Sequence, residues 1–195
     1  MDSVIDFNRK FAQHIENIFK LDFDNIYEIE FKDVGPIYVG TCKKTNREVV
    51  IKSRIKSIMD DSKEAYILWL LRNNPFVVKC LGLYYTDGTT YTVLEYIEGT
   101  ILYDCLEDDS IDHIMSKCRE ALNSIHSMNI VHGDVMETNI MVTNTGEIRF
   151  IDFEDATVNP TQKQINNDLK NLMIITKEYH SNSHWEKYRS RKSSS

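Results

Sequence analysis

The sequence predicts an α+β fold of two lobes, a small strand-rich N-terminal lobe over residues 27–97 and a truncated helical C-terminal lobe over residues 98–182. Two observations support this prediction. Residues 27–97 contain mainly strand-like apolar runs with one helical stretch, whereas beyond residue 97 the apolar residues follow the period of helices. The dipeptide Glu98-Gly99 interrupts the pattern between the halves, as a linker does. A ligand site is expected in the cleft that such lobes form.

The composition excludes several classes of protein. Apolar residues make up 42% of the chain and charged residues 27%, which is ordinary for a globular protein. The net charge of −7 argues against a protein that binds nucleic acid through bulk positive charge. No apolar stretch approaches the roughly 18 residues of a membrane span, and no signal peptide is expected at the start.

The cysteines indicate the compartment. Cys42, Cys80, Cys105 and Cys118 have no close pair and no zinc-like spacing. In a chain without an expected secretion signal, they are predicted to be reduced thiols. We therefore expect an intracellular protein, cytoplasmic or nuclear, without a membrane partner.

Residues 1–26 are predicted to form an amphipathic helix. Apolar side chains recur there at spacings of three and four, namely Val4, Phe7, Phe11, Ile15 and Ile18. Such a helix can pack on its own domain or present its apolar face to a partner, and the sequence leaves both possibilities open.

The strand-rich half shows three boundary signals. Thr45-Asn46-Arg47 marks a turn before the β-branched run of residues 48–52, and Thr86-Asp87-Gly88 marks a hairpin. Pro75 ends the helical pattern that precedes it. The predicted elements are strands over 27–53, a helix over 62–71, and strands over 76–83 and 90–96.

The second half is mainly helical. Ile111, Ile114, Met115, Cys118, Leu122 and Ile125 form one apolar stripe, and Ser110 is the predicted N-cap. Residues 140–142 and 148–151 flank the turn Asn144-Thr145-Gly146, which predicts a hairpin. A last helix is expected over residues 164–179, and residues 183–195 are predicted to be a disordered, serine-rich tail.

Three polar side chains stand out in the second half. Asp134 and Asn139 lie in the stretch His-Gly-Asp-Val-Met-Glu-Thr-Asn, and Asp152 follows the predicted hairpin. The first carboxylate can orient an acceptor hydroxyl, while the amide and the second carboxylate can hold magnesium against the phosphates of ATP. This arrangement resembles the catalytic core of protein kinases, and the resemblance extends over residues 30–180.

The resemblance implies a role for further residues. Lys52 ends a stretch that resembles the third-strand motif, so its amine would contact the α- and β-phosphates, and Glu64 would orient that amine. The C=O of Glu95 and the N–H of Ile97 would pair with the adenine edge. Further nucleotide contacts are implied for Gly35, Ile37 and Val50. In the catalytic loop, Asp134 would align the hydroxyl, Asn139 and Asp152 would bind Mg²⁺, and Asp168 would anchor the backbone.

The chain also departs from the family pattern. Only Gly35 remains of the glycine-rich loop when Ile37 takes the place of its final valine, which should weaken ATP binding. Gly133 replaces an arginine and Glu154 replaces the glycine after Asp152-Phe153. Asp152 and Asp168 lie too close in sequence for a full activation segment. The His-Gly-Asp loop is similar to that of aminoglycoside phosphotransferases and of the small ATPase of the KEOPS tRNA-modification complex.

Three functions are compatible with these observations. The first is an ATP- and Mg²⁺-dependent phosphotransferase, an atypical serine/threonine kinase that acts on a protein hydroxyl. The second is a pseudokinase that binds a partner kinase or complex. The third is an ATPase subunit of a KEOPS-like complex, the one setting in which a nucleic acid is expected. A protein substrate or regulatory partner is expected in each case.

Overall fold

The structure is a computed structural model, and it describes residues 22–32, 35–54, 58–86, 89–105 and 111–180. The predicted N-terminal helix falls almost wholly outside these residues, as do the predicted N-cap Ser110 and the serine-rich tail. The described residues divide into two compact units. The first extends to Ser62 and includes Cys80–Tyr96, and the second comprises Lys63–Lys79 and the chain from Ile97 onward.

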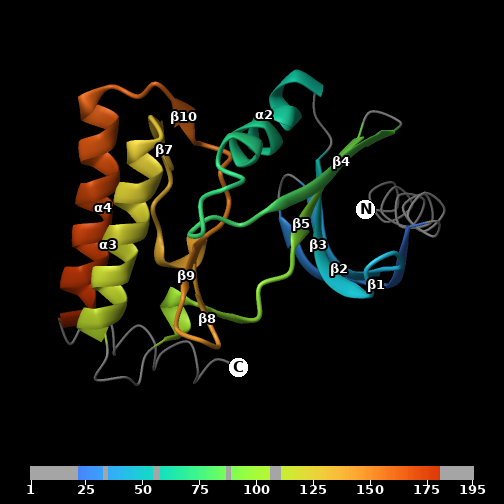
Figure 1. Ribbon diagram of the computed structural model, residues 1–195, viewed down its shortest axis with the longest axis horizontal. Coiled ribbons are helices and arrows are strands. Elements are labelled where there is room, and N and C mark those ends of the chain that lie inside the picture. Colours follow the sequence, from blue (N-terminus) through green and yellow to red (C-terminus); the bar gives the residue numbers. More distant parts are fainter. Residues whose placement is uncertain (1–21, 33–34, 55–57, 87–88, 106–110, 181–195) are drawn as a thin grey trace, which may run out of the picture. The chain divides into compact units, whose positions relative to one another are not determined.

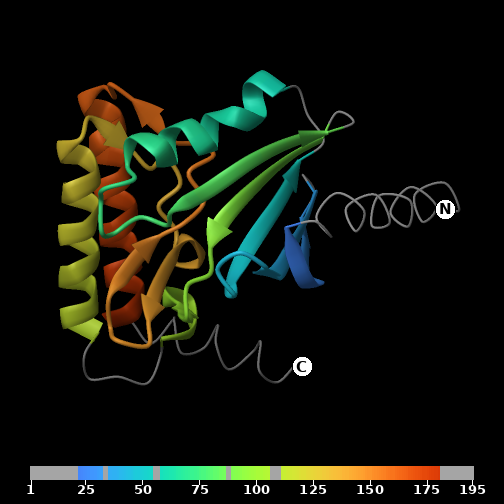
Figure 2. The same cartoon turned by 45° about the vertical axis from the view of Figure 1, so that its right-hand side comes forward.

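The first unit contains a five-stranded antiparallel sheet with the order β1-β2-β3-β5-β4 (Figures 1 and 2). Its strands are β1 (Phe23–Lys32), β2 (Gly35–Cys42), β3 (Arg47–Arg54), β4 (Cys80–Thr86) and β5 (Thr89–Glu95). The predicted hairpin of β4 and β5 is confirmed by their antiparallel pairing. β1 begins at Phe23, so residues 23–26 are strand and not the end of a helix, because they pair with β2 and Phe23 is buried.

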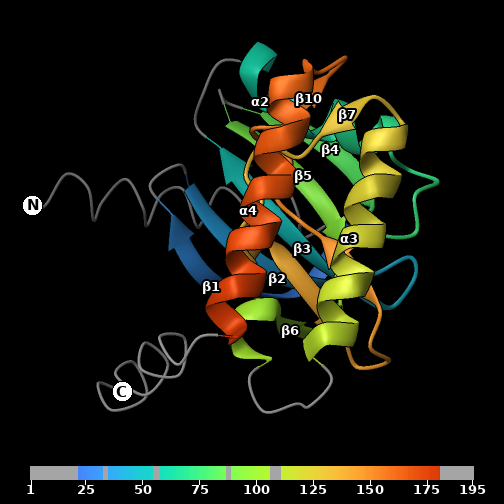
Figure 3. The same cartoon turned by 90° about the vertical axis from the view of Figure 1, so that its left-hand side faces the viewer.

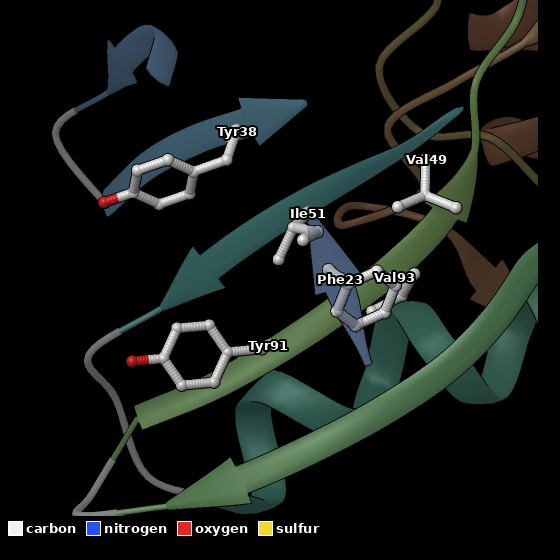
Figure 4. Packing of buried hydrophobic residues seen from close by; sticks show 6 residues of the cluster. All are labelled: Phe23, Tyr38, Val49, Ile51, Tyr91 and Val93. Carbon is white, nitrogen blue, oxygen red and sulfur yellow. The ribbon is translucent and has the colours of Figure 1, made fainter. Parts of the chain in front are cut away.

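The sheet register divides the side chains of β2 and β3 between two faces. Ile37 pairs with Lys52, and Val50 lies two residues from Lys52, so all three share one face. The other face carries the apolar cluster of Figure 4, formed by Phe23, Tyr38, Val49, Ile51, Tyr91 and Val93. Ile51 and Tyr91 are fully buried there. The alternation of β3 thus directs its lysine away from this core.

Helix α2 (Ile58–Leu70) contains the boundary between the units, because the second unit begins at Lys63. The helix begins four residues before the predicted start at 62 and ends before Pro75, as expected. Residues 76–79 were predicted as strand, but β4 begins only at Cys80. These residues instead bond to Phe150, whose N–H donates to Phe76 O and whose C=O accepts from Val78 N–H. That pairing joins residues 76–78 to β9, and residues 63–79 are grouped with the second unit.

The second unit combines two long helices with small sheets. Helices α3 (Ile111–Ser127) and α4 (Gln162–His180) lie side by side (Figures 1 and 3). The short strands are β6 (Gly99–Ile101), β7 (Ile130–Val131), β8 (Ile140–Thr143), β9 (Ile148–Phe150) and β10 (Thr157–Val158). They form a β6-β8-β9 sheet and a β10-β7 pair, with 3₁₀ turns η1 (Leu102–Asp104) and η2 (Glu137–Asn139).

The predictions for this unit are largely confirmed. The buried residues of α3 are Ile114, Met115, Cys118, Ala121, Leu122 and Ile125. The hairpin of β8 and β9 is present, and α4 lies close to its predicted range. Glu98-Gly99 was predicted to be a linker, but Gly99 is the first residue of β6 and pairs with Thr143. The overall class is α+β, as predicted.

The state of the cysteines agrees with the prediction of reduced thiols. All four cysteines are free thiols, and Cys118 is fully buried. Burial raises the pKa of the Cys118 thiol to about 12, which keeps it protonated and unreactive. Among the described residues, every helix is too short or too polar to cross a membrane.

Candidate active site

Asp134 and Asn139 are joined by a direct hydrogen bond. They lie in the connection between β7 and β8, where η2 turns the chain so that Asn139 faces back toward Asp134. Asn139 Nδ2 donates to Asp134 Oδ2 at 2.8 Å and to the Asp134 carbonyl at 3.0 Å. Both bonds use the amide nitrogen, so the amide oxygen is the atom with which Asn139 can bind a cation. The prediction that these residues act together is consistent with this geometry.

The backbone of the His-Gly-Asp loop is held by Asp168 from α4. Asp168 is 1% exposed, and its two oxygens accept the N–H groups of His132 at 2.9 Å and Gly133 at 3.1 Å. His126, at the end of α3, approaches Asp168 Oδ2 with Nε2 at 2.9 Å. A buried carboxylate needs such partners to remain charged. The implied anchoring role of Asp168 is confirmed, whereas sequence patterns gave no sign of His126.

Gly133 occupies a backbone conformation that suits glycine. Its φ is +85°, and a Cβ atom built there would lie 2.4 Å from the carbonyl oxygen of Asp155. Any side chain would therefore force the loop away from the segment that follows Asp152. The replacement of the family's arginine by glycine thus accompanies a close backbone approach, which the sequence alone could not reveal.

His132 is a buried, packed histidine. Its ring is fully buried, 4.6 Å from the Phe153 ring centroid and 5.5 Å from that of Phe150. Nε2 donates to the Ile151 carbonyl at 2.9 Å, and Nδ1 accepts the Asp134 N–H at 3.3 Å. This pattern assigns the neutral tautomer with the proton on Nε2. His132 therefore has a structural role in this loop.

His132 makes stability depend on pH. Burial lowers its pKa below 6.5, and this effect outweighs the opposing influence of the Ile151 carbonyl, Asp168, Asp134 and Asp152. The folded ring resists a proton that the unfolded chain binds, so stability is lost as pH falls below about 6.5. Between about pH 7.5 and about pH 5.5, we expect the free energy of unfolding to fall by up to about 1.4 kcal/mol from this group.

Urea unfolding of the wild type and of His132→Phe at both pH values measures this contribution. The variant cannot titrate at this position, so its free energy of unfolding should change less between the two pH values. Equal changes in both proteins would contradict the assignment.

A carboxylate of α2 lies close to two carboxylates that follow β9. Glu64, Asp152 and Glu154 can place one ligand oxygen each within 4.8 Å of one another. Glu64 is only 4% exposed, and its Oε1 accepts the N–H of Phe153 at 3.2 Å. Carboxylate oxygens are the ligands that Mg²⁺ prefers. The donor set therefore fits the implied metal. It includes Glu154, the residue that departs from the family pattern.

The residues predicted to bind the nucleotide in the first unit lie on β2, β3 and β5. Ile37, Val50 and Lys52 share a sheet face, Gly35 opens β2, and Glu95 ends β5. Ile97 is the first residue of the second unit. The pairing of Lys52 with Glu64, and the meeting of Lys52, Asn139 and Asp152 around one nucleotide, stay predictions.

A comparison with protein families identifies the class of protein. The protein kinase domain model matches residues 33–193. The chain therefore belongs to the protein kinase family, a family of phosphotransferases.

Individual relatives are serine/threonine-protein kinases. Human serine/threonine-protein kinase 10 is 29% identical over 163 residues, which are 75% of this chain and 17% of that protein. Mouse serine/threonine-protein kinase PAK 1 is 28% identical over 140 residues, 67% of this chain and 26% of that protein. The probable serine/threonine-protein kinase CPE1738 of Clostridium perfringens is 32% identical over 130 residues, 60% of this chain and 19% of that protein. The chain thus spans between 17% and 26% of these relatives' lengths.

Proposed function

We propose that this chain is an ATP- and Mg²⁺-dependent serine/threonine kinase that phosphorylates a protein hydroxyl. The observation that carries the proposal is the bonded pair of Asp134 and Asn139, held on a loop that Asp168 anchors. Phosphoryl transfer depends mainly on positioning and electrostatic stabilisation, so rigidly held polar groups are what it requires.

Each residue has a defined role in this reaction. Asp134 orients the acceptor hydroxyl and accepts its proton, while the bond from Asn139 fixes the carboxylate. Asn139 and Asp152 hold Mg²⁺, which when bound neutralises the charge that develops on the phosphates. Lys52 contacts the α- and β-phosphates, and Glu64 orients Lys52. Glu154 adds a carboxylate beside Asp152 and so strengthens the attraction for a divalent cation.

The adenine ring is assigned to the first unit and the residue that follows it. Ile37 and Val50 lie on the same sheet face as Lys52 and would cover the base. The backbone of Glu95 and Ile97 would pair with its edge. Because the glycine-rich loop has lost most of its glycines, we expect weaker nucleotide binding than in kinases that retain it.

The acceptor is proposed to be a protein. The relatives named above are serine/threonine-protein kinases, and this supports a hydroxyl acceptor. The connection between Asp152 and α4 is short and closely held, since β10 pairs with β7 and the Asn159 N–H donates to Asn129 O. It offers little surface for a peptide, so we infer that another surface or a partner protein presents the substrate.

Phosphotransfer with Asp152→Ala tests the proposal. Wild-type protein with Mg²⁺ and γ-labelled ATP should label itself or a generic protein acceptor, and Asp152→Ala should lower labelling by at least about a hundredfold. Glu120→Gln, which alters an exposed carboxylate on α3, should retain wild-type activity. Undiminished labelling in Asp152→Ala would contradict the assigned metal role.

Thermal unfolding separates the alternatives. A nucleotide at 100 times its Kd should stabilise the protein by roughly 2.7 kcal/mol. Stabilisation by Mg-ATP without labelling of any protein would favour a binding module, and ATP hydrolysis that depends on a partner protein or tRNA would favour an ATPase subunit. Absence of both labelling and stabilisation would reject the kinase proposal.

A further inference from the structure

Two neighbouring residues of α2 bind the backbone that follows Asp152. Lys63 Nζ donates to the Glu154 carbonyl at 3.0 Å, and Glu64 Oε1 accepts the Phe153 N–H at 3.2 Å. Both residues and the segment that they contact belong to the second unit. One helix turn therefore holds two consecutive residues that are about 90 positions away in the sequence.

The conformation of Asp152 explains why such contacts matter. Its φ is +66°, in the left-handed region, which costs a residue with a side chain roughly 1–2 kcal/mol. A conformation of this kind persists only where neighbouring contacts hold it. Both residues after Asp152 are held, since the Phe153 ring is buried against His132 and Lys63 bonds to the Glu154 carbonyl.

The positive charge of Lys63 also acts on the carboxylates around Asp152. Glu64, Asp152 and Glu154 place three carboxylates within a small volume, where like charges repel. Lys63 precedes Glu64 in α2 and bonds to the backbone of Glu154, so its ammonium group lies next to this cluster. Since Lys63 is exposed, solvent screens the attraction, and the hydrogen bond is the main contribution.

We propose that Lys63 is a positioning residue, which together with Glu64 holds Asp152 in its left-handed conformation and so orients the Asp152 carboxylate for Mg²⁺. This inference rests on the proposed kinase function. Helix α2 supplies the contacts, through Lys63 and Glu64.

Amide hydrogen exchange without nucleotide or metal tests the structural step. The proteins compared are wild type, Lys63→Met, Lys63→Arg and the matched control Lys170→Met, which alters an exposed helical lysine of the same unit. In Lys63→Met, a peptide covering residues 152–156 should exchange about threefold to tenfold faster, since one charged hydrogen bond is lost. Lys63→Arg should restore slow exchange, and Lys170→Met should leave it unchanged.

Steady-state kinetics tests the functional step. Lys63→Met should lower kcat by about threefold to tenfold and raise the Mg²⁺ concentration needed for half-maximal activity, while the KM for ATP stays within about twofold. Lys63→Arg should recover most of the activity. Unchanged exchange in Lys63→Met, or faster exchange with unchanged kcat and Mg²⁺ dependence, would overturn the proposal. If the wild type transfers no phosphate, the kinase function fails, and hydrogen exchange still decides whether Lys63 holds the segment.

Discussion

Replacing Asp134 with asparagine should lower kcat by about a hundredfold to ten-thousandfold, the range expected for loss of a positioned general base. The substitution keeps the size of the side chain, and its amide oxygen can still accept the bond from Asn139 Nδ2 that now measures 2.8 Å. What it removes is the negative charge that orients the acceptor hydroxyl and takes its proton. The loop should therefore remain folded while the chemical step slows.

Two measurements separate this effect from damage to the site. Binding of Mg-ATP to Asp134→Asn, followed by thermal shift, should be within about twofold of wild type, because the phosphate and metal contacts are assigned to other residues. The control Glu120→Gln should have normal kcat. A kcat for Asp134→Asn that is more than about a third of the wild-type value would show that Asp134 does not have the assigned role.

Replacing Gly133 with alanine should destabilise the second unit by about 2 kcal/mol or more. The positive φ costs an alanine roughly 1–2 kcal/mol, and the new Cβ would also lie 2.4 Å from the Asp155 carbonyl oxygen. Relief of that contact requires backbone movement. The N–H groups of His132 and Gly133 would then leave the oxygens of Asp168, which would remain buried without these partners.

Gly146→Ala provides a matched control. Gly146 has φ +76°, but a Cβ there meets only the flexible end of Lys117, at 3.9 Å. Its cost should be the backbone strain alone, about 1 kcal/mol. Urea unfolding of both variants therefore isolates the clash at Gly133. Equal losses of stability would show that the close approach to Asp155 is relieved without cost.

Local patterns predicted the elements that have a regular apolar period. The stripe of α3 and the alternation of β3 follow from the need of each element to bury one face. The turn with Asn46 and the turn with Asn144 and Gly146 lie between paired strands for the same local reason. Elements of two or three residues, such as β6, β7 and β10, were missed because their pairing depends on distant partners.

The residues of the site were predictable where a spacing rule applied. Asp134, Asn139, Asp152 and Asp168 follow such a rule, and the structure joins the first two and anchors the loop through the last. His126 and Lys63 follow none, since each is an ordinary helix residue until the fold brings it to its partner.

The order of residues along the chain determined most of the secondary structure and the α+β class, because propensity and periodicity act over a few residues, and the candidate polar groups for phosphoryl transfer came from the resemblance to protein kinases. The tertiary structure alone decided which backbone groups those residues bind. Gly133 lies against Asp155, and α2 holds the chain after Asp152, through contacts between residues far apart in sequence or in different elements. Local preferences do not encode such contacts, because they form only when the packed helices and sheets fix where each loop passes.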